Sequence, residues 1–304
     1  MSKEELAKLI RERRPKISDS SIRTYVSLLL NLNKKVNDGK ENYLQVFNKK
    51  SKEVIEYINE NVKSDQSKKT LLSALYIITG LKDYHTSMIE HAQKVNNHYK
   101  QNKIAPNRDE QRDVKVEDLQ AKYDEYLSKL NKNPTIENYI DYFVVAFTST
   151  KLMPPRRNLD VISIKLRNVN KTTDNYIDAK GNFIFNKFKT AKFNQDPDSL
   201  ERKLPVPKEL LKYIKKFSKI SDKSDYLLYH ERNGSPFSSS YFSKKLQSIY
   251  GQGITIDVIR SIFVSNLYKG LPQLQKLEDI ASSMGHTVSS ALTYYNKPSG
   301  EEDK

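Results

Sequence analysis

The segment GHTVSSALTYY, residues 285–295, places a glycine, a histidine and a tyrosine close together near the end of the chain. Gly285 is expected to end one helix, with His286 at its exit. Tyr295 follows nine positions after His286, on a second short helix. A basic ring and a phenol in this arrangement could meet at one phosphate group. The segment therefore indicates phosphate chemistry as well as the end of a helical domain.

A longer helix is predicted upstream, in TIDVIRSIFVSNLYKG, residues 255–270. Thr255 can cap its first turn and Gly270 can end it. The apolar positions recur at helical spacing and form the expected buried side, which consists of Val258, Ile259, Ile262, Phe263 and Leu267. Arg260 lies off this stripe and shares a face with Asp257, three residues earlier. The helix is therefore expected to present Arg260 away from the core.

Two basic segments lie closer to the middle of the chain. In PPRRNLDVISIK, residues 154–165, the prolines are expected to lead into a helix. The side chains expected to pack beneath it are Leu159, Ile162 and Ile164. In YIDAKGNFIFNKFKTAKF, residues 176–193, the pattern predicts a β-hairpin that turns at Lys180-Gly181-Asn182. Strands are expected at about 174–179, 183–188 and 203–206, and helices at about 207–218, 238–249, 256–268 and 274–284. This half of the chain is therefore predicted to be mostly helical with a small antiparallel sheet.

In their order along the chain, these motifs resemble those of the tyrosine recombinase (phage integrase) family. The matching residues are Arg157, Lys189, Arg260, His286 and Tyr295. The resemblance implies an all-α core-binding domain, followed by a catalytic domain of mixed α and β structure. It also implies site-specific recombination, in which DNA strands are cut and rejoined through a 3′-phosphotyrosyl intermediate. The likeness covers nearly the whole chain, but its motifs are specific only from about Arg157 onward.

These residue types suit cleavage of a phosphodiester without a metal or any other cofactor. Arginine binds phosphate oxygens bidentately and stays charged at working pH, so Arg157 and Arg260 can stabilise developing negative charge. The same positive charge favours the anion of Tyr295, the expected nucleophile, since a tyrosine has an ordinary pKa of ~10. Lys189 can donate a proton to the leaving 5′-oxygen, and His286 can bind the phosphate or help to transfer a proton.

Neighbouring residues compete for several of these roles. Arg156 competes with Arg157, which is preferred because Asp160 then follows at the family's spacing as an orienting carboxylate. Lys189 competes with two further lysines, which are Lys187 and Lys192. These two lysines and Arg156 are otherwise expected to contact DNA. Tyr294 competes with Tyr295, and the nine-residue offset from His286 favours Tyr295.

The helix around Arg260 departs from the family pattern. Asp257 stands where the family usually carries a histidine, and Ser261 stands where it often carries a second one. Asp257 is interpreted as an ion-pair partner of Arg260 in preference to a proton acceptor. These two departures keep open the alternative of a catalytically inactive sequence-specific DNA-binding protein. A type IB topoisomerase-like enzyme that relaxes DNA also stays open, because little of the chain follows Tyr295.

The composition agrees with a double-stranded DNA partner. The formal net charge is +15, of which residues 1–110 carry +7 and residues 111–304 carry +8. Binding through such charge is strongly salt-dependent. The chain has no cysteine, which excludes disulfides and zinc-thiolate sites, and its five histidines form no metal-binding repeat. His91 and His98 are expected on a solvated helix face. No leader, membrane segment or small-molecule cofactor is expected, and the predicted location is inside the cell with DNA, in a prokaryotic cytoplasm, host nucleus or viral factory.

The length suggests two domains and a linker. Residues 1–105 show helical apolar spacing, for example at Ile22, Val26 and Leu29 after the capping cluster Ser18-Asp19-Ser20. Residues 106–115 are polar and aperiodic and are expected to link this domain to a catalytic domain at 116–304. The resemblance implies self-association on DNA as a dimer or tetramer. Only NKPSGEEDK follows Tyr295, so subunit coupling is expected to be weaker, to use other surfaces, or to be absent.

Overall fold

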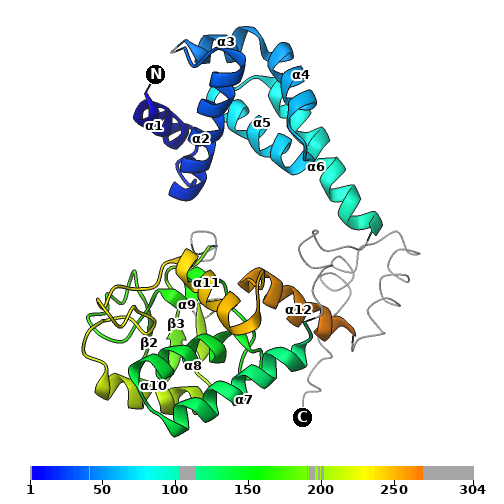
Figure 1. Ribbon diagram of the computed structural model, residues 1–304. Helices are drawn as coiled ribbons and strands as arrows, with labels where there is room; N and C mark the ends of the chain where they lie inside the picture. Colours follow the sequence, from blue (N-terminus) through cyan, green and yellow to red (C-terminus); the bar gives the residue numbers. More distant parts are fainter. Residues whose placement is uncertain are drawn as a thin grey trace, which may run out of the picture. The chain divides into compact units, whose positions relative to one another are not determined.

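The computed structural model describes residues 2–40, 42–102, 114–189, 191, 196–197, 199 and 202–269. The chain divides into two compact units, Met1–Asn107 and Arg108–Lys304. Figure 1 labels the helices of both units and the two middle strands of the sheet in the second unit. Among the described helices, none combines the length and the apolar character that crossing a bilayer requires.

The described part of the first unit is helical, as predicted. Its helices are α1 (Lys3–Arg13), α2 (Asp19–Val36), α3 (Tyr43–Lys49), α4 (Ser51–Asn61), α5 (Asp65–Thr79) and α6 (Lys82–Asn102). The side chain of Ser18 accepts a hydrogen bond from the amide of Ser21 and caps α2. Helix α5 buries Leu72 and Leu75 completely and packs against α2 and α6. Helical apolar spacing and serine caps therefore account for this unit.

The prediction of a solvated histidine on α6 was wrong for His91, which is only 4% exposed. Its Nδ1 lies 2.6 Å from Oδ1 of Asp65, and its Nε2 lies 2.8 Å from Oδ1 of Asn59. Helices α4 and α5 supply these two polar partners from outside the sequence neighbourhood of the histidine. Because a buried polar ring needs such partners, its burial was decided by helix packing. The side chain of His98 lies outside the described residues.

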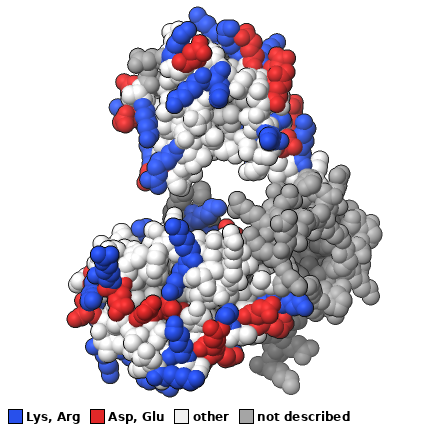
Figure 2. Space-filling model, in the orientation of Figure 1, with Lys and Arg blue, Asp and Glu red and all other residues white. Residues whose placement is uncertain are grey.

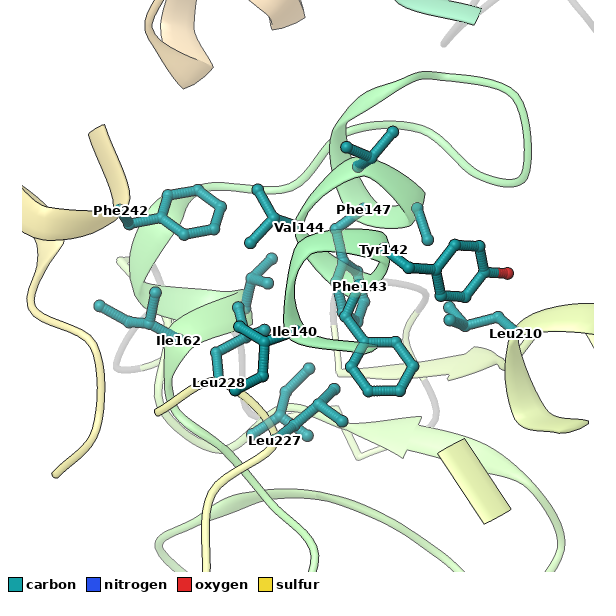
Figure 3. Packing of buried hydrophobic residues seen from close by; sticks show 14 of the residues in the cluster. Ile140, Tyr142, Phe143, Val144, Phe147, Ile162, Leu210, Leu227, Leu228 and Phe242 are labelled. Carbon is teal, nitrogen blue, oxygen red and sulfur yellow. The ribbon is translucent and has the colours of Figure 1, made fainter. Parts of the chain in front are cut away.

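The second unit is built around one buried helix. Its described helices are α7 (Val116–Lys132), α8 (Ile136–Thr148), α9 (Asn158–Ile162), α10 (Lys208–Ile220), α11 (Ser239–Tyr250) and α12 (Ile256–Lys269). Helix α8 is buried at every position from Asn138 to Thr148. Figure 3 shows its side chains packed among residues of other elements, including Ile162, Leu210, Leu227, Leu228 and Phe242. A mainly apolar helix that is buried on all sides has to be enclosed by other elements, so α8 fixes the centre of this unit.

A small sheet of four strands lies beside these helices, in the order β1-β2-β3-β4. The strands are β1 (Ile164–Lys165), β2 (Asn175–Ile177), β3 (Asn182–Ile184) and β4 (Lys203–Pro205). The predicted antiparallel pairing of β2 with β3 and of β3 with β4 is confirmed. Gly181 has φ +82°, which suits the tight turn between β2 and β3.

The expectation of a purely antiparallel sheet was wrong at one edge. Strand β1 pairs in parallel with β2, so that Ile164 lies opposite Asn175. A strand of two residues is too short to show the alternation by which strands are recognised in a sequence. The mainly helical fold with a small sheet is therefore confirmed, with a mixed sheet in place of an antiparallel one.

Candidate phosphate-binding site

Arg156 is held inside the second unit by a carboxylate and an aromatic ring. Its Nε donates a hydrogen bond to Oδ2 of Asp160 at 3.0 Å, and the two side chains are 17% and 5% exposed. Its guanidinium carbon lies 3.9 Å from the ring centroid of Phe185, directly after β3. A stacked and ion-paired arginine of this kind ties α9 to the sheet.

Arg157 takes a different position although it is the next residue. It is the N-cap of α9, with extended backbone angles of φ −69° and ψ 156°. Its side chain is half-buried and makes no hydrogen bond or ion pair with any described residue. The expected hydrogen bond that orients Arg157 through Asp160 is thus made by Arg156 instead. Arg157 keeps its donors for a ligand.

Asp160 gathers positive charge from two separate parts of the chain. Burial raises the pKa of its carboxyl above the ordinary value, and the positive charges of Arg156, Arg157 and Arg260 act in the opposite direction. Its Oδ1 atom is buried and accepts no hydrogen bond from the described residues. Arg156 contacts this carboxylate, and the charges of Arg157 and Arg260 act on it as well, so positive charge exceeds negative charge around Asp160. Such an excess suits an anion with several oxygens, such as a phosphodiester.

Arg260 reaches this site from α12, a helix that begins as the sequence predicts. The hydroxyl of Thr255 accepts a hydrogen bond from the amide of Val258 at 3.4 Å and caps the first turn. Val258 and Ile259 are buried, whereas Leu267, expected on the same buried side, is 56% exposed. Nη1 of Arg260 lies 3.6 Å from Oδ1 of Asp257, with side chains 33% and 83% exposed. An ion pair this exposed contributes little and leaves Arg260 free to turn to a ligand.

Leu159 of α9 also differs from expectation, because it is 36% exposed. Ile162 and Ile164 are buried beneath α9 as predicted. The helix has only five residues. So short a helix needs only one buried side. Ile162 at its end and Ile164 in the following strand are the buried residues here.

The lysine loop, defined as residues 185–189, follows β3. Phe188 is buried and anchors it, while Lys189 is exposed beside it. Hydrogen bonds from Lys165 and from the amide of Asn170 hold the pKa of Asp174 below its ordinary value, and the positive charge of Lys187 adds to this. The positive charge of Lys187 therefore acts on Asp174, which directly precedes β2. Lys187 and Lys189 are both exposed.

Sequence reasoning missed Asn175, the first residue of β2, which is completely buried. Its side chain joins α9 to the lysine loop, with hydrogen bonds to the backbone of Asp160 and of Lys187. Asparagine is depleted in strands, so its presence at the start of one is the signal that could have drawn attention to it.

In the described residues, Arg156 contacts Asp160, and Arg157 and Arg260 act on the same carboxyl electrostatically. Lys192, His286 and Tyr295 lie outside the described residues. On the face shown in Figure 2, lysine and arginine side chains of each unit are interspersed with acidic ones. The excess of positive charge around Asp160 thus comes from Arg156, Arg157 and Arg260, and it is distinct from the general basic character of the chain.

Comparisons with known proteins identify one similar structure. No protein-family model matches the chain, and no curated protein matches it. A solved structure of the Tn1549 transposon integrase, in complex with a circular intermediate DNA, shares 13% sequence identity and a TM-score of 0.45. The similarity covers 96% of this chain and 95% of that chain. At this TM-score the similarity carries no functional assignment, which has to come from the residues of the site.

Proposed function

We propose that the protein is a tyrosine site-specific recombinase, which cuts and rejoins DNA strands through a covalent 3′-phosphotyrosyl intermediate. The observation that carries the proposal is that Arg157 and Arg260, which lie about a hundred residues apart in sequence, both act electrostatically on the buried carboxyl of Asp160, which Arg156 contacts. The sequence order of the five matching residues supports it. So does the net charge of +15, which suits a polyanionic partner.

In this proposal the two arginines bind the non-bridging oxygens of one phosphodiester. The phenol oxygen of Tyr295 attacks phosphorus after its proton passes to His286 or to water. The bond from phosphorus to the 5′-oxygen breaks, and that oxygen takes a proton from the ammonium group of Lys189. The 3′-phosphate is left on the tyrosine. Attack by a 5′-hydroxyl reverses these steps and rejoins the strand, so the bond energy is conserved without a nucleotide cofactor.

Double-stranded DNA is the proposed partner, with the helical first unit contributing to its binding. Self-association on DNA as a dimer or tetramer belongs to the same proposal. The positive charge of both parts of the sequence supports contacts along the DNA backbone. We further propose that the DNA which the protein cuts and rejoins is that of a mobile genetic element.

The adjacent tyrosines provide the test. Wild-type protein is incubated with nicked DNA that carries the ends of its own element, without metal or ATP, and the DNA-linked peptide is mapped by mass spectrometry. Tyr295→Phe removes one hydroxyl and should abolish the covalent product, while Tyr294→Phe, the matched control, should still form it. An adduct that persists in Tyr295→Phe and vanishes in Tyr294→Phe overturns the assignment of the nucleophile.

The same substrates separate the competing functions. Specific binding by wild-type protein with no adduct would indicate a non-catalytic DNA-binding protein. Relaxation of supercoiled DNA without site dependence would indicate a topoisomerase-like enzyme. Either result overturns the recombinase proposal.

A further inference from the structure

One buried side chain connects the two segments that carry the proposed cations. Nδ2 of Asn175 donates to the carbonyl oxygen of Asp160 at 3.1 Å and to the carbonyl oxygen of Lys187 at 2.9 Å. Its Oδ1 accepts from the amide of Lys187 at 2.6 Å. Both amide hydrogens and the amide oxygen are therefore used. The residue is 0% exposed, so water cannot substitute for these bonds.

The bonds of Asn175 fix backbone positions on both sides. Asp160 lies in the last turn of α9. The carbonyl groups of a last turn receive no hydrogen bond from an amide further along the helix, so the carbonyl of Asp160 can accept one from Asn175. Lys187 receives and donates one bond each, so its peptide groups cannot rotate without losing both. Lys189 follows only two residues later, and Arg157 lies three residues before Asp160. Asn175 is thus one of the contacts that set the spacing between the lysine loop and the arginine segment, together with Arg156, which pairs with Asp160 and stacks on Phe185.

We propose that Asn175 is a positioning residue, which holds the loop bearing Lys189 at a fixed distance from Arg157. Asn175 itself does not touch the phosphodiester. It acts through the backbone of Lys187, so that the ammonium group of Lys189 meets the 5′-oxygen of the phosphodiester bound by the arginines. This inference rests on the proposed recombinase function. It adds to that function a residue, Asn175, that sets the position of the proton donor Lys189 relative to Arg157.

Asn186 offers a matched control in the same loop. Its Nδ2 donates to the carbonyl oxygens of Lys171 and Asp174 at 2.8 and 2.9 Å. It therefore has the same chemistry as Asn175 but makes no hydrogen bond to the described residues of α9 or to Lys187. Replacing Asn186 tests whether any disturbance of the loop is enough to affect cleavage.

The experiment compares two nicked substrates in single-turnover reactions of the full chain. One has the natural 5′-bridging oxygen. The other has sulfur there, and its thiolate leaves without a proton because a thiol is far more acidic than an alcohol. Asn175→Asp keeps the shape of the side chain but loses both donors. A displacement of about 1 Å can lower a rate on the order of a hundredfold, so the oxygen substrate should be cleaved about that much more slowly.

The sulfur substrate should be cleaved by Asn175→Asp at nearly the wild-type rate, because proton donation is no longer needed. DNA affinity should also stay near wild type, and Asn186→Asp should cleave both substrates normally. Asn175→Ser, which keeps a hydroxyl donor, provides a second variant if the aspartate disturbs folding. Wild-type rates on the oxygen substrate for both Asn175 variants would overturn the inference. Equal loss on both substrates by both variants would assign Asn175 to folding alone and would also overturn it.

Failure of the underlying function is distinguishable in the same assay. If wild-type protein binds its DNA but cleaves neither substrate, the recombinase proposal fails and this inference fails with it. If wild-type protein cleaves both substrates and the variants show no selective loss, only the role of Asn175 is refuted.

Discussion

Replacing each of the two adjacent arginines by methionine should separate a structural arginine from a ligand-binding one. Methionine keeps much of the length of the side chain and removes the charge. In Arg156→Met, Asp160 loses its hydrogen-bond donor, and the ring of Phe185 loses the guanidinium group at 3.9 Å. In Arg157→Met, no hydrogen bond or ion pair within the described residues is lost.

The expected loss of stability follows from the burial of the pair. Removing one partner of a fully buried ion pair typically costs ~3–5 kcal/mol. Arg156 is 17% exposed, and Arg157 and Arg260 still act on the carboxyl, so about 2–3 kcal/mol is expected here. For a domain of this size, 1 kcal/mol shifts the Tm by roughly 2–4 °C, which gives a decrease of ~4–12 °C for Arg156→Met. Arg157→Met should stay within ~0.5 kcal/mol of wild type, as surface substitutions usually do.

Thermal and urea unfolding, followed by circular dichroism, measure both variants, and Asp160→Asn completes a double-mutant cycle. The substitutions of Arg156 and Asp160 should be coupled, since the two side chains touch. Binding to a DNA duplex should weaken in Arg157→Met although the fold is intact. Equal stability losses for the two arginine variants, or no coupling between Arg156 and Asp160, would refute the division of roles.

Four further outcomes are expected. Arg260→Lys keeps the charge but loses the bidentate fork, so DNA binding should persist while the cleavage rate falls on the order of a hundredfold; a normal rate would make Arg260 a surface contact. Lys189→Ala should slow cleavage of the natural substrate, whereas Lys187→Ala should not, and the reverse result would exchange their roles. Burial raises the pKa of Asp160 in the folded state above its ordinary value. At a pH between these two pKa values, the folded state therefore binds more protons than the unfolded state. The stability of wild type relative to Asp160→Asn, measured by urea unfolding from about pH 4 upward, should therefore fall as the pH rises through that window, and a relative stability that rises with pH would contradict this reasoning. Affinity of the full chain for duplex DNA, measured by fluorescence anisotropy, should fall by orders of magnitude from low to moderately high salt, and salt-independent binding would argue against phosphate contacts.

Local sequence signals determined most of the secondary structure. Ser18 caps α2, Thr255 caps α12, and Gly181 forms the turn between β2 and β3, as the sequence predicted. The apolar spacing also located α2 and α5 in the first unit and α10, α11 and α12 after the sheet, while the helix predicted at 274–284 lies outside the described residues. These features are readable because the interacting groups lie within a few residues of each other.

The contacts that define the site were decided by tertiary structure. The three-residue spacing between Arg157 and Asp160 suggested that these two residues interact. In the structure Arg156 donates the hydrogen bond to Asp160, and its guanidinium group also stacks on the ring of Phe185. Asn175 was overlooked since its partners lie 12 and 15 residues away in sequence.

The sequence by itself determined the residue types on which the proposed phosphate chemistry depends, and their order along the chain. Tertiary structure alone decided the parallel pairing of β1, the burial of His91 and the electrostatic action of Arg260 on Asp160. The physical reason is the range of the interactions. Caps and turns are satisfied within one or two turns of backbone, whereas a buried charge or amide takes whichever partner the packing of distant elements brings to it.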